Sequence, residues 1–251
     1  MSSPLLEVDG VSRTFGNLVA VNDVSYALDS GELVALIGPN GAGKTTMYNL
    51  LSGQLTPTTG EIRFDGRTIE SMSPAERSHL GVGRSFQITN VFEGMTVREN
   101  IRAPIVARSK ARFDPISNVE SHDALSEETN EILELIGLTD IEHKECATLP
   151  YGDKRRVEIG VTLATDPKLV LLDEPTAGMN PQQADDMIDL IEYLYDQIDV
   201  TFLVTEHDMD IVFALAERIL VLDQGEIIAD NDPKAIRSDE LVQSAYLGGG
   251  R

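Results

Sequence analysis

One stretch decides the fold of this chain: Gly38-Pro39-Asn40-Gly41-Ala42-Gly43-Lys44-Thr45-Thr46. It matches the pattern G-x-x-x-x-G-K-[ST], a loop whose backbone N–H groups cradle phosphate groups. The apolar run of residues 32–37 before it predicts a buried strand, and residues 45–51 after it predict the start of a helix. This order of strand, loop and helix predicts that the chain binds a nucleoside triphosphate.

The chemistry of the loop explains its residue types. Glycines let the backbone turn tightly and point N–H groups at phosphate oxygens, where a side chain would block the approach. The helix N-terminus adds a partial positive charge. We expect Lys44 to reach the β- and γ-phosphates and the Thr45 hydroxyl to ligate Mg²⁺.

Length and composition describe a globular protein with one domain, or one domain with a subdomain. Of the 251 residues, 41% are apolar. The longest apolar run covers residues 211–216, far short of the ~20 residues that span a bilayer. Cys146 is the single cysteine and no signal segment opens the chain, so we expect a reducing, cytoplasmic compartment.

Charge is the unusual feature of the composition. Asp and Glu number 42 against 20 Lys and Arg, which gives a formal net charge of −22. A polyanion such as nucleic acid would be repelled. A well-solvated acidic surface would explain the charge, but we favour adaptation to a cytoplasm with molar salt, where the Debye length shrinks to ~3 Å.

The N-terminal part of the chain shows strand patterns. Residues 5–11 predict a strand, residues 13–17 a turn, and residues 24–28 a half-buried strand with alternating apolar positions. Residues 61–64 and 68–69 then flank Asp65-Gly66, a hairpin signal. We therefore expect an antiparallel sheet beside the nucleotide core.

The middle of the chain predicts a helical insertion over about residues 92–164. Ser73 and Thr96 each precede a helix start with a glutamate three residues later, the pattern of a capping box. Residues 102–126 are polar, contain two prolines and indicate irregular structure. Apolar residues then recur at helical spacing over 132–136.

The C-terminal part alternates strands and helices. Strands are predicted at residues 169–172, 201–205, 218–222 and 226–229. Asn180 and Pro181 open a helix with an apolar stripe made of Ala184, Met187, Ile188, Ile191 and Leu194. Strands alternating with helices after a phosphate loop imply a mostly parallel sheet covered by helices.

Candidate catalytic residues follow two of these strands. Asp173 and Glu174 end a buried strand, where Asp173 can hold Mg²⁺ through water and Glu174 can orient the attacking water. Gln87 follows a strand-like segment, and His207 lies just past the 201–205 strand. A loop glutamine and a structural histidine are the alternatives, which the order of both residues relative to the loop disfavours.

A further stretch, residues 149–160, has the sequence Leu-Pro-Tyr-Gly-Asp-Lys-Arg-Arg-Val-Glu-Ile-Gly and precedes the Asp-Glu pair. Together these stretches resemble the nucleotide-binding subunit of an ABC transporter, from about residue 5 to the tail. The resemblance implies the α/β P-loop NTPase fold of ABC ATPases: a mostly parallel core sheet, an antiparallel β subdomain and a helical subdomain. A single domain would span residues 1–251, with the helical subdomain at about 92–164 and a tail at about 226–251.

Within that family the chain looks like a branched-chain amino acid importer subunit. The segments that carry this likeness are Arg155-Arg156-Val157-Glu158-Ile159, Gly81-Val82-Gly83-Arg84-Ser85-Phe86-Gln87, Phe92-Glu93-Gly94-Met95-Thr96-Val97 and Ala245-Tyr246-Leu247-Gly248. The resemblance implies an ATPase that energises uptake of branched-chain or other hydrophobic amino acids. Its partners would be permease subunits, an extracytoplasmic binding protein and a second ATPase subunit, at the inner face of the cell membrane.

The resemblance also assigns roles to residues. Phe15 would stack on adenine, although an ordinary core aromatic at a strand end is the alternative. Gln87 would contact Mg²⁺ or the attacking water and sense the membrane subunits. Glu174 would be the general base, and His207 would touch the γ-phosphate.

A signature sequence would complete the ATP site of a partner subunit, so that two subunits sandwich two ATPs. It comprises Leu149, Pro150, Tyr151, Gly152 and Asp153. The family usually has Leu-Ser-Gly-Gly-Gln here, but Pro150 lacks both a hydroxyl and an N–H, and Tyr151 replaces a glycine. We therefore favour a heterodimer whose sister subunit carries a fuller signature, with a homodimer that relies on Gly152 as the alternative.

Two other classes of protein remain as rivals. A soluble ABC ATPase of repair or translation usually carries two cassettes, a long coiled coil or a metal-binding insertion, and this chain has one cassette and no heptads. A P-loop kinase or GTPase would leave the signature and His207 unexplained, and no guanine-reading Asn-Lys-x-Asp is present.

Overall fold

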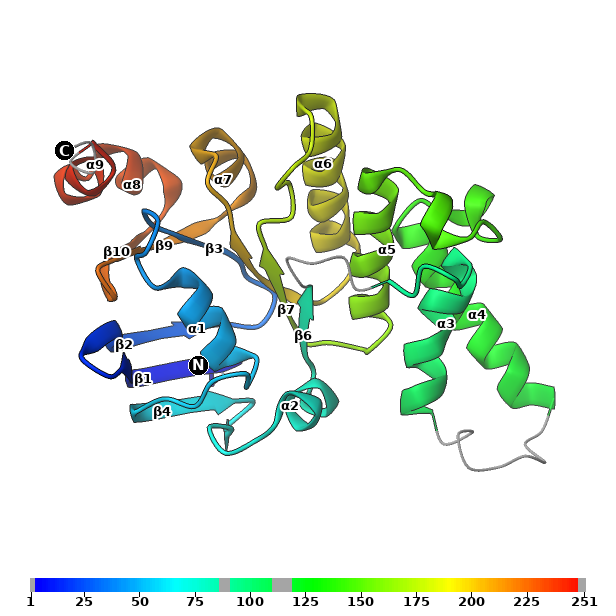
Figure 1. The fold of residues 1–251 in the computed structure, drawn as a ribbon, viewed down its shortest axis with the longest axis horizontal. Coiled ribbons are helices and arrows are strands. Elements are labelled where there is room, and N and C mark those ends of the chain that lie inside the picture. Colours follow the sequence, from blue (N-terminus) through cyan, green and yellow to red (C-terminus); the bar gives the residue numbers. More distant parts are fainter. Residues whose placement is uncertain (1–2, 86–90, 110–118, 248–251) are drawn as a thin grey trace.

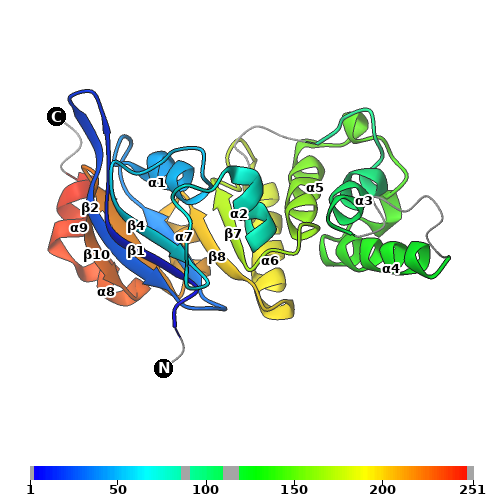
Figure 2. The same cartoon turned by 90° about the horizontal axis from the view of Figure 1, so that it is seen from below.

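The chain folds around two β-sheets and a group of helices (Figure 1). The computed structural model describes residues 3–85, 91–109 and 119–247. One sheet has six strands in the order β10-β9-β3-β8-β7-β6, and the other has four in the order β2-β1-β4-β5. Helices α3, α4 and α5, here called the helical arm, lie at the end of the molecule opposite α8 and α9 (Figure 2).

The strands are β1 (Leu6–Phe15), β2 (Leu18–Leu28), β3 (Leu33–Ile37), β4 (Thr59–Phe64), β5 (Arg67–Thr68), β6 (Val82–Ser85), β7 (Leu169–Asp173), β8 (Thr201–Thr205), β9 (Arg218–Asp223) and β10 (Glu226–Asn231). The α-helices are α1 (Lys44–Leu51), α2 (Pro74–Leu80), α3 (Val97–Arg108), α4 (Val119–Leu135), α5 (Tyr151–Leu163), α6 (Pro181–Gln197), α7 (Met209–Leu215), α8 (Pro233–Ser238) and α9 (Glu240–Leu247). Among the described residues, the short 3-10 helices η2 (Thr139–Ile141) and η3 (Cys146–Thr148) lie between α4 and α5.

The six-stranded sheet is the core, and it is mostly parallel as predicted. Strands β6, β7, β8, β3 and β9 run parallel, and β10 pairs antiparallel with β9. Strands β3, β7 and β8 are buried at every position, as expected for parallel strands covered on both faces.

Alternate side chains of β3 enter two different hydrophobic clusters. Leu33, Ala35 and Ile37 belong to the cluster that contains the helical arm, α6 and α7. Val34 and Leu36 belong to the cluster between α1 and the antiparallel sheet. This alternation follows from the two-residue period of a strand. Both faces of β3, the strand that leads into the phosphate loop, are therefore held by hydrophobic packing.

The antiparallel sheet contains the predicted hairpin and corrects one predicted boundary. Strands β4 and β5 join at Asp65 and Gly66, both with positive φ, as a two-residue hairpin turn requires. The predicted turn at residues 13–17 begins too early, because β1 continues to Phe15 and only Gly16 and Asn17 form the turn before β2. Register shifts between Val8 and Thr14 interrupt the alternation of buried and exposed side chains, so the sequence pattern ends before the strand does.

The structure confirms the two predicted capping boxes, at the starts of α2 and α3. The Ser73 and Thr96 side chains each accept a hydrogen bond from the N–H of the third helical residue, and the glutamate there accepts one in return. Asn180 caps α6, and Met187, Ile188, Ile191 and Leu194 of its predicted stripe are buried. Ala184 is only partly buried.

The prediction of irregular structure over residues 102–126 is wrong at both ends of that range. Helix α3 continues through Pro104 to Arg108, and α4 begins at Val119. Val97, Ile101 and Ile105 of α3 are fully buried, and this burial outweighs the loss of one helical hydrogen bond at the proline. Among the described residues, no helix combines the length and apolar character needed to cross a bilayer.

Candidate nucleotide site

The phosphate loop occupies the connection between β3 and α1. Gly43 has φ 112°, and a Cβ there would lie 2.5 Å from the Ala20 carbonyl oxygen, far inside van der Waals contact. Gly41 also has a positive φ, of 83°. The loop conformation therefore requires glycine at these positions, and α1 begins directly after it, at Lys44.

Lys44 folds back over the loop. Its Nζ donates hydrogen bonds to the carbonyl oxygens of Gly38 (2.6 Å) and Pro39 (3.2 Å). Burial lowers the pKa of Lys44, while the nearby carboxylates of Glu174 and Asp173 oppose that fall. The ammonium group thus lies between the loop backbone and two acidic side chains, where it can pair with phosphate oxygens.

A hollow of about 310 Å³ runs along the loop. Its lining comprises Phe15, Leu18, Val19 and Ala20 from the N-terminal strands, residues 40–46 of the loop and α1, and Glu174 and His207. Phe15 is 43% exposed, so it is not a buried core aromatic. The hollow therefore combines an aromatic surface with polar and charged groups, both of which a nucleotide needs.

Asp173 ends β7 in a buried position. Its Oδ1 accepts a hydrogen bond from the Thr205 hydroxyl (2.9 Å), and its Oδ2 accepts one from Arg84 Nη2 (3.0 Å). Only 3% of the Asp173 side chain is exposed. The ion pair and the hydrogen bond offset the cost of burying this carboxylate.

Glu174 and His207 meet at the carboxyl edge of the core sheet. The parallel pairing of β7 with β8 brings the residues after both strands together, and His207 Nε2 lies 2.6 Å from Glu174 Oε1. Glu174 has φ 48°, an uncommon conformation for a side chain larger than glycine and one that concentrates at functional sites. Its N–H bonds to both the carbonyl and the hydroxyl of Thr205.

The signature residues lie apart from this hollow. Leu149 is buried, Pro150 is the N-cap of α5, and Tyr151 begins the helix. Proline suits this position, because its fixed φ is compatible with a helix entry. None of residues 149–153 is among those that line the hollow.

Tyr151 connects the signature to the segment that follows β7. Its hydroxyl donates a hydrogen bond to the Ala177 carbonyl oxygen (3.1 Å). Gly152 lies beside it, and a Cβ added there would come no closer than 3.8 Å to the Gln183 side chain.

Of the predicted site residues, the structure brings together the loop, Phe15, Asp173, Glu174 and His207, while Gln87 lies outside the described residues.

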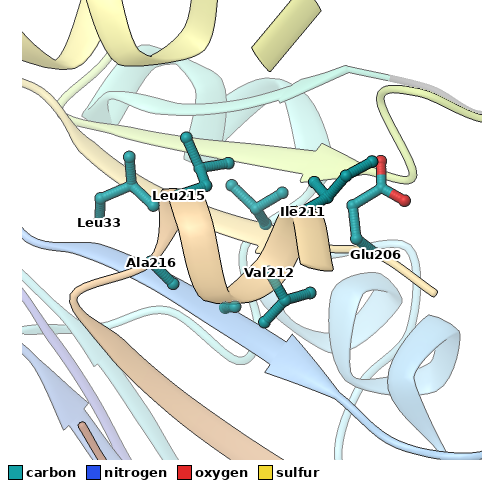
Figure 3. A pocket seen from close by; sticks show the side chains of 8 residues that line it. Leu33, Glu206, Ile211, Val212, Leu215 and Ala216 are labelled. Carbon is teal, nitrogen blue, oxygen red and sulfur yellow. The ribbon is translucent and has the colours of Figure 1, made fainter. Parts of the chain in front are cut away.

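The sequence assigns no role to two residues near the site, Glu206 and Arg84. Glu206 is buried, and its Oε1 accepts hydrogen bonds from the Thr176 N–H (2.9 Å) and hydroxyl (2.7 Å). Figure 3 shows Glu206 at one end of a small hollow whose other side chains are apolar and come from β3, β8, α7 and the residue after α7. The second is Arg84 on β6, which reaches Asp173. A charged residue inside an otherwise buried strand was the available signal for Arg84.

Fold and pocket together define the class of this protein: it is a P-loop nucleoside triphosphatase built on a helix-covered, mostly parallel sheet. Comparison with known proteins identifies the branch of that class. Residues 21–177 match the family model described as ABC transporter. The chain belongs to the ABC transporter family, as one of its ATP-binding ATPase subunits.

Relatives align over nearly the whole chain. The high-affinity branched-chain amino acid transport ATP-binding protein BraF of Pseudomonas aeruginosa is 39% identical over 254 residues, with 99% of each chain covered. LivG of Escherichia coli strain K12, which has the same description, is 40% identical over 253 residues, again with 99% of each covered. A probable LivG of Archaeoglobus fulgidus is 32% identical, with 97% of this chain and 95% of that one covered.

Solved structures show the same fold. An ATP-binding cassette of an ABC transporter in its ADP conformation matches with a TM-score of 0.85 and 30% identity, covering 98% of this chain and 100% of that one. A nucleotide-free cassette matches with a TM-score of 0.81, also at 30% identity, covering 97% and 99%. The predicted fold class is therefore confirmed.

Proposed function

We propose that this chain hydrolyses ATP to energise an importer of branched-chain or other hydrophobic amino acids. The observation that carries the proposal is the single hollow that joins the phosphate loop to Glu174 and His207. Relatives named for branched-chain amino acid transport support the substrate class, because the alignment covers 99% of each chain.

Residues in and next to the hollow fit Mg²⁺ as well as ATP. The Thr45 hydroxyl lines the hollow, and the Asp173 carboxylate ends β7 directly before Glu174, which also lines it. Both groups are hard oxygen donors, which this ion prefers. When bound, the ion would neutralise negative charge on the phosphate groups. Lys44 would pair with the β- and γ-phosphates, and the loop N–H groups would hold the remaining oxygens.

Hydrolysis would depend on Glu174 and His207. The Glu174 carboxylate would orient a water molecule and accept its proton, as a general base. His207, within hydrogen-bond distance of Glu174, would contact the γ-phosphate, and we expect Gln87 to complete the water or Mg²⁺ contacts. Phe15, which also lines the hollow, would stack on the adenine ring.

The signature residues would serve a second ATPase subunit. Because residues 149–153 do not line the hollow of their own chain, a dimer would give them a nucleotide to contact. Loss of the usual serine hydroxyl could cost ~1.5–3 kcal/mol of phosphate binding, roughly ten- to a hundred-fold. The Gly152 N–H and the N-terminus of α5 would offset part of this loss. A sister subunit with a fuller signature would make the missing phosphate contact at the ATP site of this chain.

The remaining partners follow from an import function. Permease subunits would hold this chain at the inner face of the cell membrane, and a binding protein would deliver the amino acid from outside. The helical arm, within residues 92–164, would be a subdomain that carries the signature, and residues from about 226 would form a tail.

The net charge of −22 would adapt the subunit to a cytoplasm with molar salt.

The test is to purify this chain with its permease and sister subunit and to measure leucine uptake into liposomes that contain ATP. Uptake should require both ATP and the binding protein. Glu174→Gln should retain ATP binding and lower hydrolysis by about a thousandfold or more, because it removes the group that polarises water. Lys44→Ala should instead weaken ATP binding itself.

Several outcomes would contradict parts of this proposal. Near-normal turnover in Glu174→Gln would mean that another residue is the base. A chain that hydrolyses ATP at full rate and never associates with a permease would be a non-transport ABC ATPase. Full activity from this chain without a sister subunit would rule out the obligate heterodimer.

A further inference from the structure

Arg84 makes a buried ion pair with the carboxylate that the proposed function assigns to Mg²⁺. Its Nη2 lies 3.0 Å from Asp173 Oδ2, and only 9% of the Arg84 side chain and 3% of the Asp173 side chain are exposed. The pair joins β6 to β7, which are adjacent parallel strands. Burial of both charges makes their geometry rigid, because no water competes for either partner.

The other terminal nitrogen of Arg84 reaches α1. Nη1 donates hydrogen bonds to Asn49 Oδ1 (2.7 Å) and to the hydroxyl of Ser52 (3.0 Å), the C-cap residue of that helix. The guanidinium carbon also lies 5.8 Å from the centre of the Tyr48 ring. One planar cation therefore connects the helix that follows the phosphate loop to the strand that ends in Asp173.

Asp173 is held from both sides as a result. Thr205 donates to Oδ1 while Arg84 donates to Oδ2, so the plane of the carboxylate has one orientation. A guanidinium holds such a plane through a fixed fork of donors, whereas an ammonium acts as a point charge. Groups that orient a metal-binding carboxylate in this way strongly affect metal affinity.

We propose that Arg84 is a positioning residue, which fixes Asp173 relative to α1 so that the carboxylate is oriented for Mg²⁺ bound with ATP. The proposal rests on the proposed function, since it concerns the same site. Arg84 touches neither nucleotide nor water in this role and acts only through Asp173. Its loss should therefore change the Mg²⁺ dependence of nucleotide binding more than nucleotide binding itself.

Arg77 offers a matched control. It is also a buried arginine, with 1% exposed, and it also supports α1. Its guanidinium, however, donates to main-chain carbonyls, including those of Leu50 and Leu51 at the end of α1. A conservative change at Arg77 should reduce the packing of α1 without altering the orientation of Asp173.

The experiment compares Arg84→Lys with Arg77→Lys in the full chain, because lysine keeps the positive charge and removes the fork. A fluorescent trinitrophenyl-ATP is titrated first in EDTA and then at increasing Mg²⁺. For Arg84→Lys we expect affinity in EDTA within about twofold of wild type and a Mg²⁺ concentration at half-saturation raised about tenfold. For Arg77→Lys we expect a lower melting temperature and an unchanged Mg²⁺ requirement.

Asn49→Ala provides a second variant should Arg84→Lys fail to fold. It removes one contact between Arg84 and α1 and leaves the ion pair with Asp173 in place, so we expect a rise of about threefold in the Mg²⁺ requirement. An unchanged Mg²⁺ requirement in both variants would overturn the proposal and make Arg84 a purely structural residue. An equal loss of affinity in EDTA would also overturn it, because Arg84 would then support the loop. Absence of any Mg²⁺ effect in the wild-type chain would instead contradict the proposed function.

Discussion

The phosphate loop and the signature, two regions expected to contact ATP, differ in how the chain builds them. The loop lies between β3 and α1, and Gly43 within it has no room for a Cβ because the Ala20 carbonyl would be 2.5 Å away. The signature begins α5 at the margin of the helical arm, with Pro150 as a cap that makes no side-chain hydrogen bond. A Cβ at Gly152 would stay at least 3.8 Å from the atoms that pack against its helix, the nearest of which belongs to the Gln183 side chain.

This difference shows which residue types are required by contacts within the chain itself. The geometry of the loop is enforced by its own neighbours, so its residue types follow a strict pattern. The signature is in contact with its own chain mainly through Leu149 and the hydrogen bond from Tyr151 to Ala177. Any requirement for Gly152 would have to come from a partner subunit, which explains how this segment can depart from the usual family sequence while the loop does not.

The largest effect should come from adding a methyl group to each region. Gly43→Ala combines a positive φ with a clash against main-chain oxygen, so we expect nucleotide affinity to fall by roughly a hundredfold or more, or the fold to be lost. Gly152→Ala should leave folding and nucleotide binding of the isolated chain unchanged and lower the ATPase rate only in the assembled transporter. Circular dichroism and a fluorescent nucleotide titration measure both. Equal damage to the isolated chain from both changes would contradict the comparison.

A smaller effect is expected from restoring the usual serine with Pro150→Ser. Pro150 already has the extended backbone of an N-cap, with φ −56° and ψ 157°, so serine should cap α5 and stabilise it by about 1 kcal/mol. Its hydroxyl should also contact the partner's γ-phosphate and raise turnover there by about tenfold. Thermal unfolding and the ATPase rate of the assembled dimer check the two effects separately. A stabilised helix with unchanged turnover would show that Gly152 is sufficient for the signature's contact with the partner's ATP.

The smallest effect concerns salt, which should act on the helical arm more than on the loop region. Asp123, Glu127 and Glu131 of α4 follow one another at four-residue spacing, and each such pair costs a few tenths of a kcal/mol. Helix α1 has no acidic residue. Raising KCl from about 0.2 to 2 M should screen this repulsion, so amide exchange should slow in α4 more than in α1, and the melting temperature should rise. A flat or falling melting temperature would contradict the salt-adaptation hypothesis.

Much of the fold could be predicted because its signals are local. Three examples are the loop pattern, the Asp65-Gly66 hairpin and the capping boxes at Ser73 and Thr96, since each depends on residues within a few positions of one another. The end of β1 and the continuation of α3 through Pro104 could not be predicted in this way. In both cases pairing or burial against distant segments outweighed the local pattern.

The sequence by itself determined the chemistry of this protein: a phosphate loop, a strand-ending Asp-Glu pair and a histidine, in an order that indicates an ATP-binding subunit. Only the tertiary structure decided how those groups meet. The parallel pairing of β7 and β8 brings His207 to Glu174, and the position of β6 lets Arg84 join Asp173 to α1. The physical reason is that strand ends far apart in the chain share one sheet edge, and contacts of that kind leave no periodic signal in the sequence.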